Sequence, residues 1–466
     1  MIQKNNIPKH WQLKKLEELL VFVIGGDWGK DPSLNDPNYE TAYCIRGSEI
    51  KDWEVLKGRT ASLRKIKKTS LETRTLKEGD ILVEISGGGP EQPVGRTVLI
   101  DKTVLSFNPA IPKICTNFFR LIRPIKGIDS KFLHFYLILF YFSGEVVRYQ
   151  AGSNNLRNLK FSDYVKIEIP LPPLPEQQAI VAKIEELFSE LDKGVESLKT
   201  AQQQLKVYRQ SLLKWAFEGR LTSAYFDKAQ HEPLSGRPRL LSEAETSGNM
   251  AAEEKEKYGN NELPEGWIET EIKNVCLDIK VGIVIKPTNF YSKTGKGIKA
   301  FRSANVRELK INDADWVYFT KEANEINHRT KLNFGDVLIV RSGYPGTSCI
   351  VSKEFEGCNA IDILIATPNK EKILPEYLCY FNNSPLGKGL FILKSRGVAQ
   401  KHLNVGEYSK LVVHIPSLKE QQRIVDELES RLTVCDKIEK TINEGLQQSE
   451  ALRQSILKRA FEGRLV

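Results

Sequence analysis

The clearest hydrophobic pattern in this chain is a narrow apolar stripe through two long, otherwise polar segments. In residues 176–221 and 420–465, apolar side chains recur at alternating steps of three and four. That spacing predicts one long helix in each segment, with the seam of a coiled coil along one face. A helix of roughly 40 residues is about 60 Å long. Its stripe needs a partner, because a single amphipathic helix is only marginally stable in water.

These two segments are copies of each other. They align without a gap at an offset of 244, and 21 of the 46 positions are identical. The two predicted helices can therefore bury their stripes against each other. Gly219 and Gly463 follow Ala-Phe-Glu in the two copies, and glycine at this point is typical of a helix end.

The duplication extends into the regions that precede each helix. The pattern Asn-x-x-Pro-x-x-Trp occurs at 5–11 and 261–267, and Gly-Asp followed by an apolar run occurs at 79–83 and 335–339. Such a run after a turn predicts a buried strand. In each copy an apolar, helix-like segment and a closing strand that ends at prolines follow. Each region is therefore predicted to be a mixed α/β domain.

The repeats predict the fold class and the domain boundaries. We expect duplicated α/β (α+β) domains joined by two long antiparallel coiled-coil helices, a dumbbell with pseudo-twofold symmetry. Residues 222–262 are polar and rich in Ser, Glu, Ala and Gly, as is typical of a linker. The predicted boundaries are 1–170 for the first globular domain, 171–221 for the first long helix, 222–262 for the linker, 263–414 for the second globular domain and 415–466 for the second long helix.

Composition narrows the classes of protein only modestly. The net charge of +9 favours an acidic partner such as nucleic acid, although many basic proteins bind nothing anionic. Seven scattered cysteines form neither a disulfide framework nor a zinc motif. The start of the chain lacks a signal-peptide pattern, and the apolar run 132–142 is about half of a membrane span. We expect a cytoplasmic protein with no membrane partner.

Catalytic motifs are missing from the sequence. No phosphate-binding Walker loop occurs, and the nearest approach to an adenine methyltransferase motif, at Asn108-Pro-Ala-Ile, lacks the second proline and the aromatic residue. The six histidines stand singly, without metal-ligand spacing. We expect no catalytic residue, metal or cofactor in this chain.

The positive signals are those of a DNA-binding protein. Residues 57–77 hold eight Lys and Arg against the single acid Glu72, enough to neutralise several phosphates. Gly-rich loops follow the predicted buried strands, and amide-rich or basic loops lie near the end of each domain. A solvated basic face, a tight turn or a surface loop would give the same patterns. The candidate DNA-binding residues are Arg46, Lys65, Lys67, Lys68, Ser86, Gly87, Arg96, Asn154, Asn155, Arg157, Arg302, Asn305, Arg341, Ser342, Tyr344, Gln400, Lys401 and His402.

The helix entries carry a resemblance to a known family. Leu-Pro-Pro-Leu-Pro-Glu-Gln-Gln at 171–178, its partner Ile-Pro-Ser-Leu-Lys-Glu-Gln-Gln at 415–422 and the Ala-Phe-Glu-Gly-Arg-Leu helix ends resemble the specificity subunit of type I restriction–modification systems. The resemblance covers essentially the whole chain. It implies that each globular domain is a target-recognition domain that reads one half of a split site in double-stranded DNA.

The resemblance also implies partner subunits. The paired helices would be both spacer and docking platform for two DNA adenine methyltransferase subunits, which bring S-adenosylmethionine. Restriction subunits would bring ATP- and Mg-dependent translocation and cleavage. Two other classes compete: a self-contained restriction–methylation enzyme, which the missing motifs disfavour, and a structural coiled-coil tether with two heads that do not bind DNA.

Overall fold

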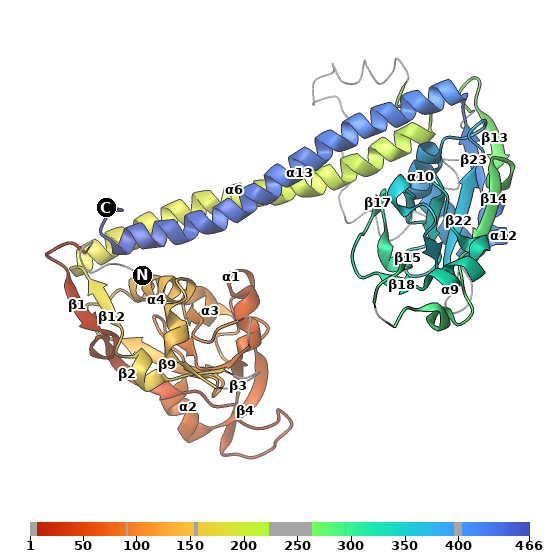
Figure 1. Ribbon diagram of the computed structural model, residues 1–466. Coiled ribbons are helices and arrows are strands. Elements are labelled where there is room, and N and C mark those ends of the chain that lie inside the picture. Colours follow the sequence, from red (N-terminus) through yellow and green to blue (C-terminus); the bar gives the residue numbers. More distant parts are fainter. Residues whose placement is uncertain (1–6, 90–91, 153–156, 223–262, 294, 396–402) are drawn as a thin grey trace. The chain divides into compact units, whose positions relative to one another are not determined.

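The computed structural model describes residues 7–89, 92–152, 157–222, 263–293, 295–395 and 403–466 (Figure 1). It divides the chain into two compact units, Met1–Lys199 with Asn443–Val466, and Thr200–Ile442. Each unit contains one globular domain, the beginning of one long helix and the end of the other. Most of the predicted linker, residues 223–262, lies outside the described residues.

The two predicted long helices are confirmed. They are α6 (Leu174–Phe217) and α13 (Leu418–Phe461), each 44 residues long. Pro175 lies in the first turn of α6, where its missing N–H costs no hydrogen bond. Beyond the helix ends, Gly219 and Gly463 have φ angles of 68° and 65°. Only glycine adopts this left-handed conformation without strain, so both glycines end their helices as the sequence predicts.

Within each unit, a part of α6 lies against a part of α13. In the first unit, Asp192 forms an ion pair with Arg453, and Leu198 contacts Gly445. In the second unit, Arg209 Nη2 donates to Asp436 Oδ1 at 2.7 Å. In the first unit, the sequence positions rise along α6 as they fall along α13, because Asp192 and Leu198 contact Arg453 and Gly445. The two helices are therefore antiparallel in this unit.

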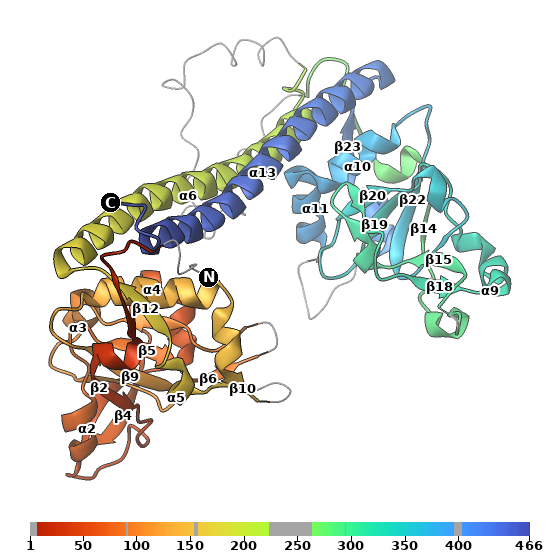
Figure 2. The same cartoon turned by 60° about the vertical axis from the view of Figure 1, so that its left-hand side comes forward.

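The first globular domain is a mixed α/β fold of small sheets (Figure 2). The strand orders are β2-β9-β5-β7, β4-β3-β8, β10-β11-β6 and β1-β12. The strands are β1 (Gln12–Lys15), β2 (Leu20–Gly25), β3 (Tyr39–Ile45), β4 (Ser62–Lys67), β5 (Ile81–Glu84), β6 (Ser86–Gly88), β7 (Thr97–Leu99), β8 (Lys113–Cys115), β9 (Phe119–Pro124), β10 (Gln150–Ala151), β11 (Arg157–Leu159) and β12 (Glu168–Leu171). The helices are α1 (Trp53–Leu56), α2 (Lys68–Arg74), α3 (Lys102–Ser106), α4 (Ser130–Phe142) and α5 (Phe161–Tyr164), with 3-10 turns η2 (Leu16–Leu19), η3 (Gly47–Asp52) and η4 (Glu145–Tyr149).

The second globular domain repeats this plan with differences in detail. Its strand orders are β14-β22-β19-β20, β18-β15-β21, β16-β17 and β13-β23. The strands are β13 (Ile268–Glu271), β14 (Cys276–Val281), β15 (Ile298–Phe301), β16 (Val306–Arg307), β17 (Lys310–Ile311), β18 (Val317–Phe319), β19 (Val337–Val340), β20 (Ser348–Ile350), β21 (Asn359–Ala360), β22 (Ile363–Pro368) and β23 (Val412–Ile415). The helices are α9 (Lys321–Ile326), α10 (Pro375–Asn383), α11 (Pro385–Ser395) and α12 (Val405–Ser409), with 3-10 turns η7 (Ile272–Asn274), η8 (Pro287–Phe290), η9 (Ser303–Asn305), η10 (His328–Thr330) and η11 (Lys353–Phe355).

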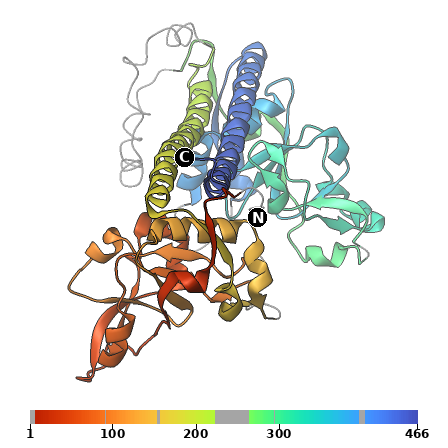
Figure 3. The same ribbon diagram turned by 90° about the vertical axis from the view of Figure 1, so that its left-hand side faces the viewer.

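The long helices are part of the core of each unit. In the first unit, the beginning of α6 and the end of α13 lie beside the first globular domain (Figure 3). Ile180 and Ile184 of α6 and Phe461 of α13 belong to a cluster of buried residues that includes much of α4. The ring of Phe461 lies 5.0 Å from that of Phe132. In the second unit, the ring of Phe217 lies 5.1 Å from that of Tyr377 in α10. Burial of these aromatic rings fixes each helix end against a domain.

A buried glutamine anchors the beginning of each long helix. Gln177 Oε1 accepts a hydrogen bond from the backbone of Asp129 at 2.9 Å, and its Nε2 donates to Pro172 O at 2.9 Å. Gln421 makes the same pair of bonds, with Leu374 N at 2.9 Å and Pro416 O at 3.0 Å. Each glutamine thus joins the start of a long helix to the domain's own buried helix, α4 or α10. These bonds explain why the first glutamine of the Glu-Gln-Gln motif occurs in both copies.

In the described part of the chain, no helix is long and apolar enough to span a membrane. Nor does any group of three or more His, Cys, Asp or Glu side chains there have the geometry of a metal site.

Candidate nucleic-acid interface

In the first domain, the candidate segments meet where the central strand β5 ends. The Ser86-Gly-Gly stretch, expected as a loop, is the short strand β6, and it pairs with β11 so that Gly88 lies opposite Arg157. The backbone N–H of Leu159 also donates to Ile85 O at 2.8 Å. The correction has a simple cause: glycines leave the backbone open to a neighbouring strand, and that strand carries a second group of candidates.

A concave cavity of about 790 Å³ opens at this strand end. Four of the sequence candidates, Arg46, Ser86, Gly87 and Arg96, are among the residues that line it. Trp28 and Phe118 lie in its wall and are unusually exposed for large apolar side chains. Donors, acceptors and exposed aromatic rings around one hollow are the side-chain types that bind nucleotides.

Two buried carboxylates sit beside this cavity, and each is paired with an arginine. Glu84, the last residue of β5, accepts from Arg96 Nε at 2.8 Å. Glu49 accepts from Arg46 Nη2 at 2.6 Å, and these hydrogen bonds raise the pKa of Arg46. Both glutamates are almost fully buried. Their charges are compensated, so the acids do not oppose an anionic ligand.

The candidate lysines of the basic stretch lie in β4 and at the start of α2. Strand β4 pairs with β3, which ends next to the cavity. Lys65 and Lys67 lie in β4 and Lys68 begins α2; Lys67 and Lys68 are exposed, and Lys65 is half-buried. Because Lys67 pairs with Tyr39 at the start of β3, these lysines lie at the opposite end of that strand from Arg46. Arg64 connects the two regions: its guanidinium stacks 4.3 Å from the ring of Trp28.

In the second domain the candidates meet at the corresponding strand end. Arg341 follows β19, and its Nε donates to Leu403 O at 3.0 Å while Nη1 pairs with Asp362 at 2.6 Å. Ser342 is half-buried, and Tyr344 is 83% exposed. The bond between Arg341 and Leu403 joins this loop to the residue that directly follows the candidates Gln400, Lys401 and His402. Those three residues, like Asn154 and Asn155, lie outside the described residues.

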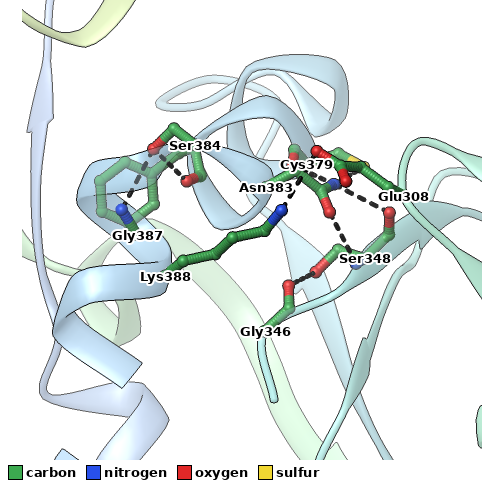
Figure 4. Close-up of polar contacts among 9 residues, drawn as sticks. Glu308, Gly346, Ser348, Cys379, Asn383, Ser384, Gly387 and Lys388 are labelled. Carbon is green, nitrogen blue, oxygen red and sulfur yellow. Dashed lines mark hydrogen bonds and ion pairs between the residues drawn. The ribbon is translucent and has the colours of Figure 1, made fainter. Parts of the chain in front are cut away.

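A network of buried polar side chains lies next to this loop, at the junction of α10 and α11 (Figure 4). Asn383 Oδ1 accepts from Ser348 N at 3.1 Å, and its Nδ2 donates to Ser348 O at 2.9 Å. Next to it, Ser384 Oγ accepts from Gly387 N in the first turn of α11. Gly346 packs so closely on Phe391 of α11 that a Cβ there would lie 2.1 Å from the ring. Helix α11 therefore fixes the end of the Arg341–Gly346 loop.

Arg302 and Asn305 occupy a turn rather than this strand end. Asn305 is fully buried, and its Nδ2 donates to Asn312 O and Ala314 O. Its Oδ1 accepts from Arg302 N at 3.0 Å, which closes the turn η9. The structure thus places Asn305 in the interior of the domain, where its amide bonds to backbone groups and is shielded from solvent. Arg302 is half-buried, and its Nη2 donates to Asp315 O at 2.5 Å.

The duplicated pattern matches one family model over most of the chain. That model, "Type I restriction modification DNA specificity domain", matches residues 8–205 and 264–448. The chain belongs to this family. Among curated members, the EcoKI specificity subunit of Escherichia coli (strain K12) is 25% identical, with 98% of this chain and 90% of that protein covered. The StySPI specificity subunit of Salmonella potsdam is 24% identical, and the alignment covers 100% of this chain and 91% of that protein.

Two solved structures share the fold. A chain from a structure of a type I R-M system aligns with a TM-score of 0.69 at 19% identity, covering 98% of this chain and 99% of that one. The HsdS subunit from Thermoanaerobacter tengcongensis aligns with a TM-score of 0.55 at 18% identity, covering 98% of each chain. These alignments support the fold of two α/β domains with two long helices.

Several residues of this specificity chain were not found from the sequence. Trp28, Glu49, Phe118 and Asp362 all lie at the strand-end sites. Trp28 stands in the polar, Gly-rich segment Gly-Gly-Asp-Trp-Gly, and an aromatic residue in such a segment is a usable signal. Glu49 and Asp362 give none, because acidic residues are common in a charged protein and only the fold shows which arginine each one pairs with.

Proposed function

We propose that this chain is the DNA-recognition subunit of a type I restriction–modification complex, in which each globular domain reads one half of a bipartite site. The observation that carries the proposal is that, in both domains, candidate segments far apart in the sequence meet at the end of the central strand. In both domains, the residue that follows the central strand bonds to a residue much later in the chain: Ile85 O accepts from Leu159 N, and Arg341 O accepts from Leu403 N. Phosphate contacts would come from the exposed lysines of β4 and α2.

The chain itself is a non-catalytic subunit, as is general for this family. Methyl transfer would take place in methyltransferase subunits that bind S-adenosylmethionine, and translocation and cleavage in restriction subunits that use ATP and Mg. The purified chain alone should therefore transfer no methyl group from labelled S-adenosylmethionine to DNA. Incorporation by the chain alone would contradict this part of the proposal.

Two methyltransferase subunits fit the internal repeat. Each unit has a hollow between its buried helix and a long helix, lined by Tyr136 and Gln454 in one and by Tyr380 and Gln210 in the other. Gln210 and Gln454 correspond at the repeat offset of 244. Equivalent surfaces take equivalent partners, so we expect a complex with two methyltransferase subunits to one of this chain. The mass of the co-expressed complex from light scattering tests that ratio.

The decisive experiment is a domain exchange. Residues 263–414 are replaced with the equivalent domain of a relative of different specificity, and DNA bound by the co-expressed complex is selected from a randomised library. One half of the selected sequence should change while the other half stays the same. Altered bases in both halves would contradict independent reading. Selection of no sequence by the wild-type complex would favour the alternative, a tether whose heads do not bind DNA.

A further inference from the structure

The side chain of Arg46 is held along one edge by a buried carboxylate. Its Nε donates to Glu49 Oε1 at 3.2 Å, and its Nη2 donates to the same oxygen at 2.6 Å. The Glu49 side chain is 2% exposed, whereas that of Arg46 is 39% exposed. The guanidinium is therefore fixed by the protein on its Nε–Nη2 edge, while another part of it is open to solvent.

The open part is the end of the guanidinium fork. Among the described residues, Nη1 of Arg46 has no hydrogen-bond partner. Apart from Glu49, the described part of the chain offers Nη2 one acceptor, Thr60 O at 3.5 Å, which is the longest hydrogen bond of this side chain. Nη1 and Nη2 together form the pair of parallel donors that matches O6 and N7 on the major-groove edge of guanine.

The surroundings of Arg46 leave room for such a base edge. Arg46 lines the 790 Å³ cavity, and its neighbours there include Gly47 and Gly87. A Cβ at either glycine would lie within 4 Å of Glu84 Oε1, so the missing side chains extend the cavity down to the Glu84–Arg96 pair. Arg46, Arg96 and Lys51 outnumber Glu49 and Glu84 by one positive charge around this cavity, which suits an anionic duplex.

The second domain shows which part of the Arg46–Glu49 pairing is needed to form the turn. Arg302 corresponds to Arg46 at the repeat offset of 256, and Asn305 corresponds to Glu49. In both domains the side-chain oxygen accepts from the arginine backbone N–H, at 2.5 Å from Glu49 and 3.0 Å from Asn305. An amide is thus sufficient to close the turn. The carboxylate that holds the arginine side chain is additional in the first domain.

We propose that Arg46 reads a guanine in the first half-site and that Glu49 is its positioning residue. The proposal rests on the proposed function and adds the base and the residue that selects it. Holding the fork before DNA arrives removes the rotamer entropy that a free arginine would lose on binding. Arg302, which lacks the carboxylate, does not read the corresponding base in the second half-site.

The test compares Arg46→Ala and Glu49→Gln in the full chain, co-expressed with its methyltransferase subunit and selected on a library with both half-sites randomised. Both variants should relax the preference for guanine at the same single position of the first half-site, by roughly 5- to 150-fold. The second half-site should keep its sequence. Glu49→Gln retains an oxygen for the backbone bond, so its thermal unfolding should match the wild type.

Arg59→Ala is the matched control, since it removes one exposed positive charge from the same domain. It should leave the base preference at every position unchanged, even where overall affinity falls. Unchanged preference at all positions in Arg46→Ala, or relaxation of different positions in the two variants, would overturn the proposal while leaving the bipartite function intact. A wild-type complex that selects no sequence would instead overturn the function on which it rests.

Discussion

Pro8 lies directly against Gly463, although the two residues are near opposite ends of the chain. A Cβ built on Gly463 would come within 2.2 Å of Pro8 Cγ, and the indole of Trp11 lies next to the same point. In the second unit, Gly219 meets Pro264 and Trp267 in the same way, with a distance of 2.3 Å to Pro264 Cγ. In each unit, the Pro-x-x-Trp motif thus packs against the glycine that ends a long helix.

This contact predicts that Gly463→Ala destabilises the first unit. The alanine would need a left-handed backbone and would also meet the proline ring, so we expect a loss of about 1–3 kcal/mol in the free energy of unfolding. Chemical denaturation of the wild type and the variant measures it. Gly194→Ala is the matched control, because nothing lies within 4 Å of its Cβ position inside α6. That variant should be neutral or slightly stabilising; equal losses in both would contradict the role of the Pro8 contact.

A second prediction concerns Arg341 of the second domain. Its side chain is 14% exposed and is bonded to Asp362 and Leu403. Arg341→Ala should weaken binding to the specific site by about 1–3 kcal/mol and relax only the second half-site, since it alters the strand end of that domain alone. Titration with specific and with non-specific DNA separates the two effects. Unchanged binding to both would show that Arg341 only closes a turn.

A third prediction is a pH dependence from a buried histidine. Burial lowers the pKa of His134 in α4 to about 4, and its Nε2 lies 3.2 Å from Thr97 O. Between pH 6.5 and 4 the unfolded chain binds a proton that the folded chain does not. His134 therefore contributes stability above pH 6.5 that is lost as the pH falls, up to about 3 kcal/mol.

The measurement is the free energy of unfolding at pH 7.5, 6 and 5. The decrease toward pH 5 should be smaller in His134→Leu than in the wild type. His328→Ala, a change at an exposed histidine of the second domain, should keep the full decrease. An identical pH dependence in all three proteins would mean that His134 does not control it.

The parts of the fold that follow from the sequence are those with a repeated local signal. The stripes of α6 and α13, the glycines at their ends and the buried strands β5 and β19 are all set by local periodicity or backbone conformation. The candidate sites depend on long-range strand pairing, and local periodicity does not determine the register of such a pairing. Gly88 and Arg157 lie opposite each other only because β6 and β11 pair. Asn305 is a polar residue, and it is buried because the backbone of its turn bonds to its amide.

The last prediction concerns the long helices as a spacer between the half-sites. The Leu198–Gly445 contact indicates that the points after Lys199 in α6 and after Ile442 in α13 lie at matched heights. Inserting seven residues at both points keeps the apolar stripes in register and lengthens each helix by about 10 Å. At about 3.4 Å per base pair, this corresponds to roughly three more base pairs between the half-sites. The duplex also turns over these pairs, so affinity should fall where the twist of the helix pair does not compensate. The half-site sequences should not change.

Selection from a library with spacers of random length measures the preferred spacing. The control is the same heptad inserted in α6 alone, which breaks the register of the two apolar stripes. An unchanged preferred spacing with tight binding would show that α6 and α13 do not set the distance.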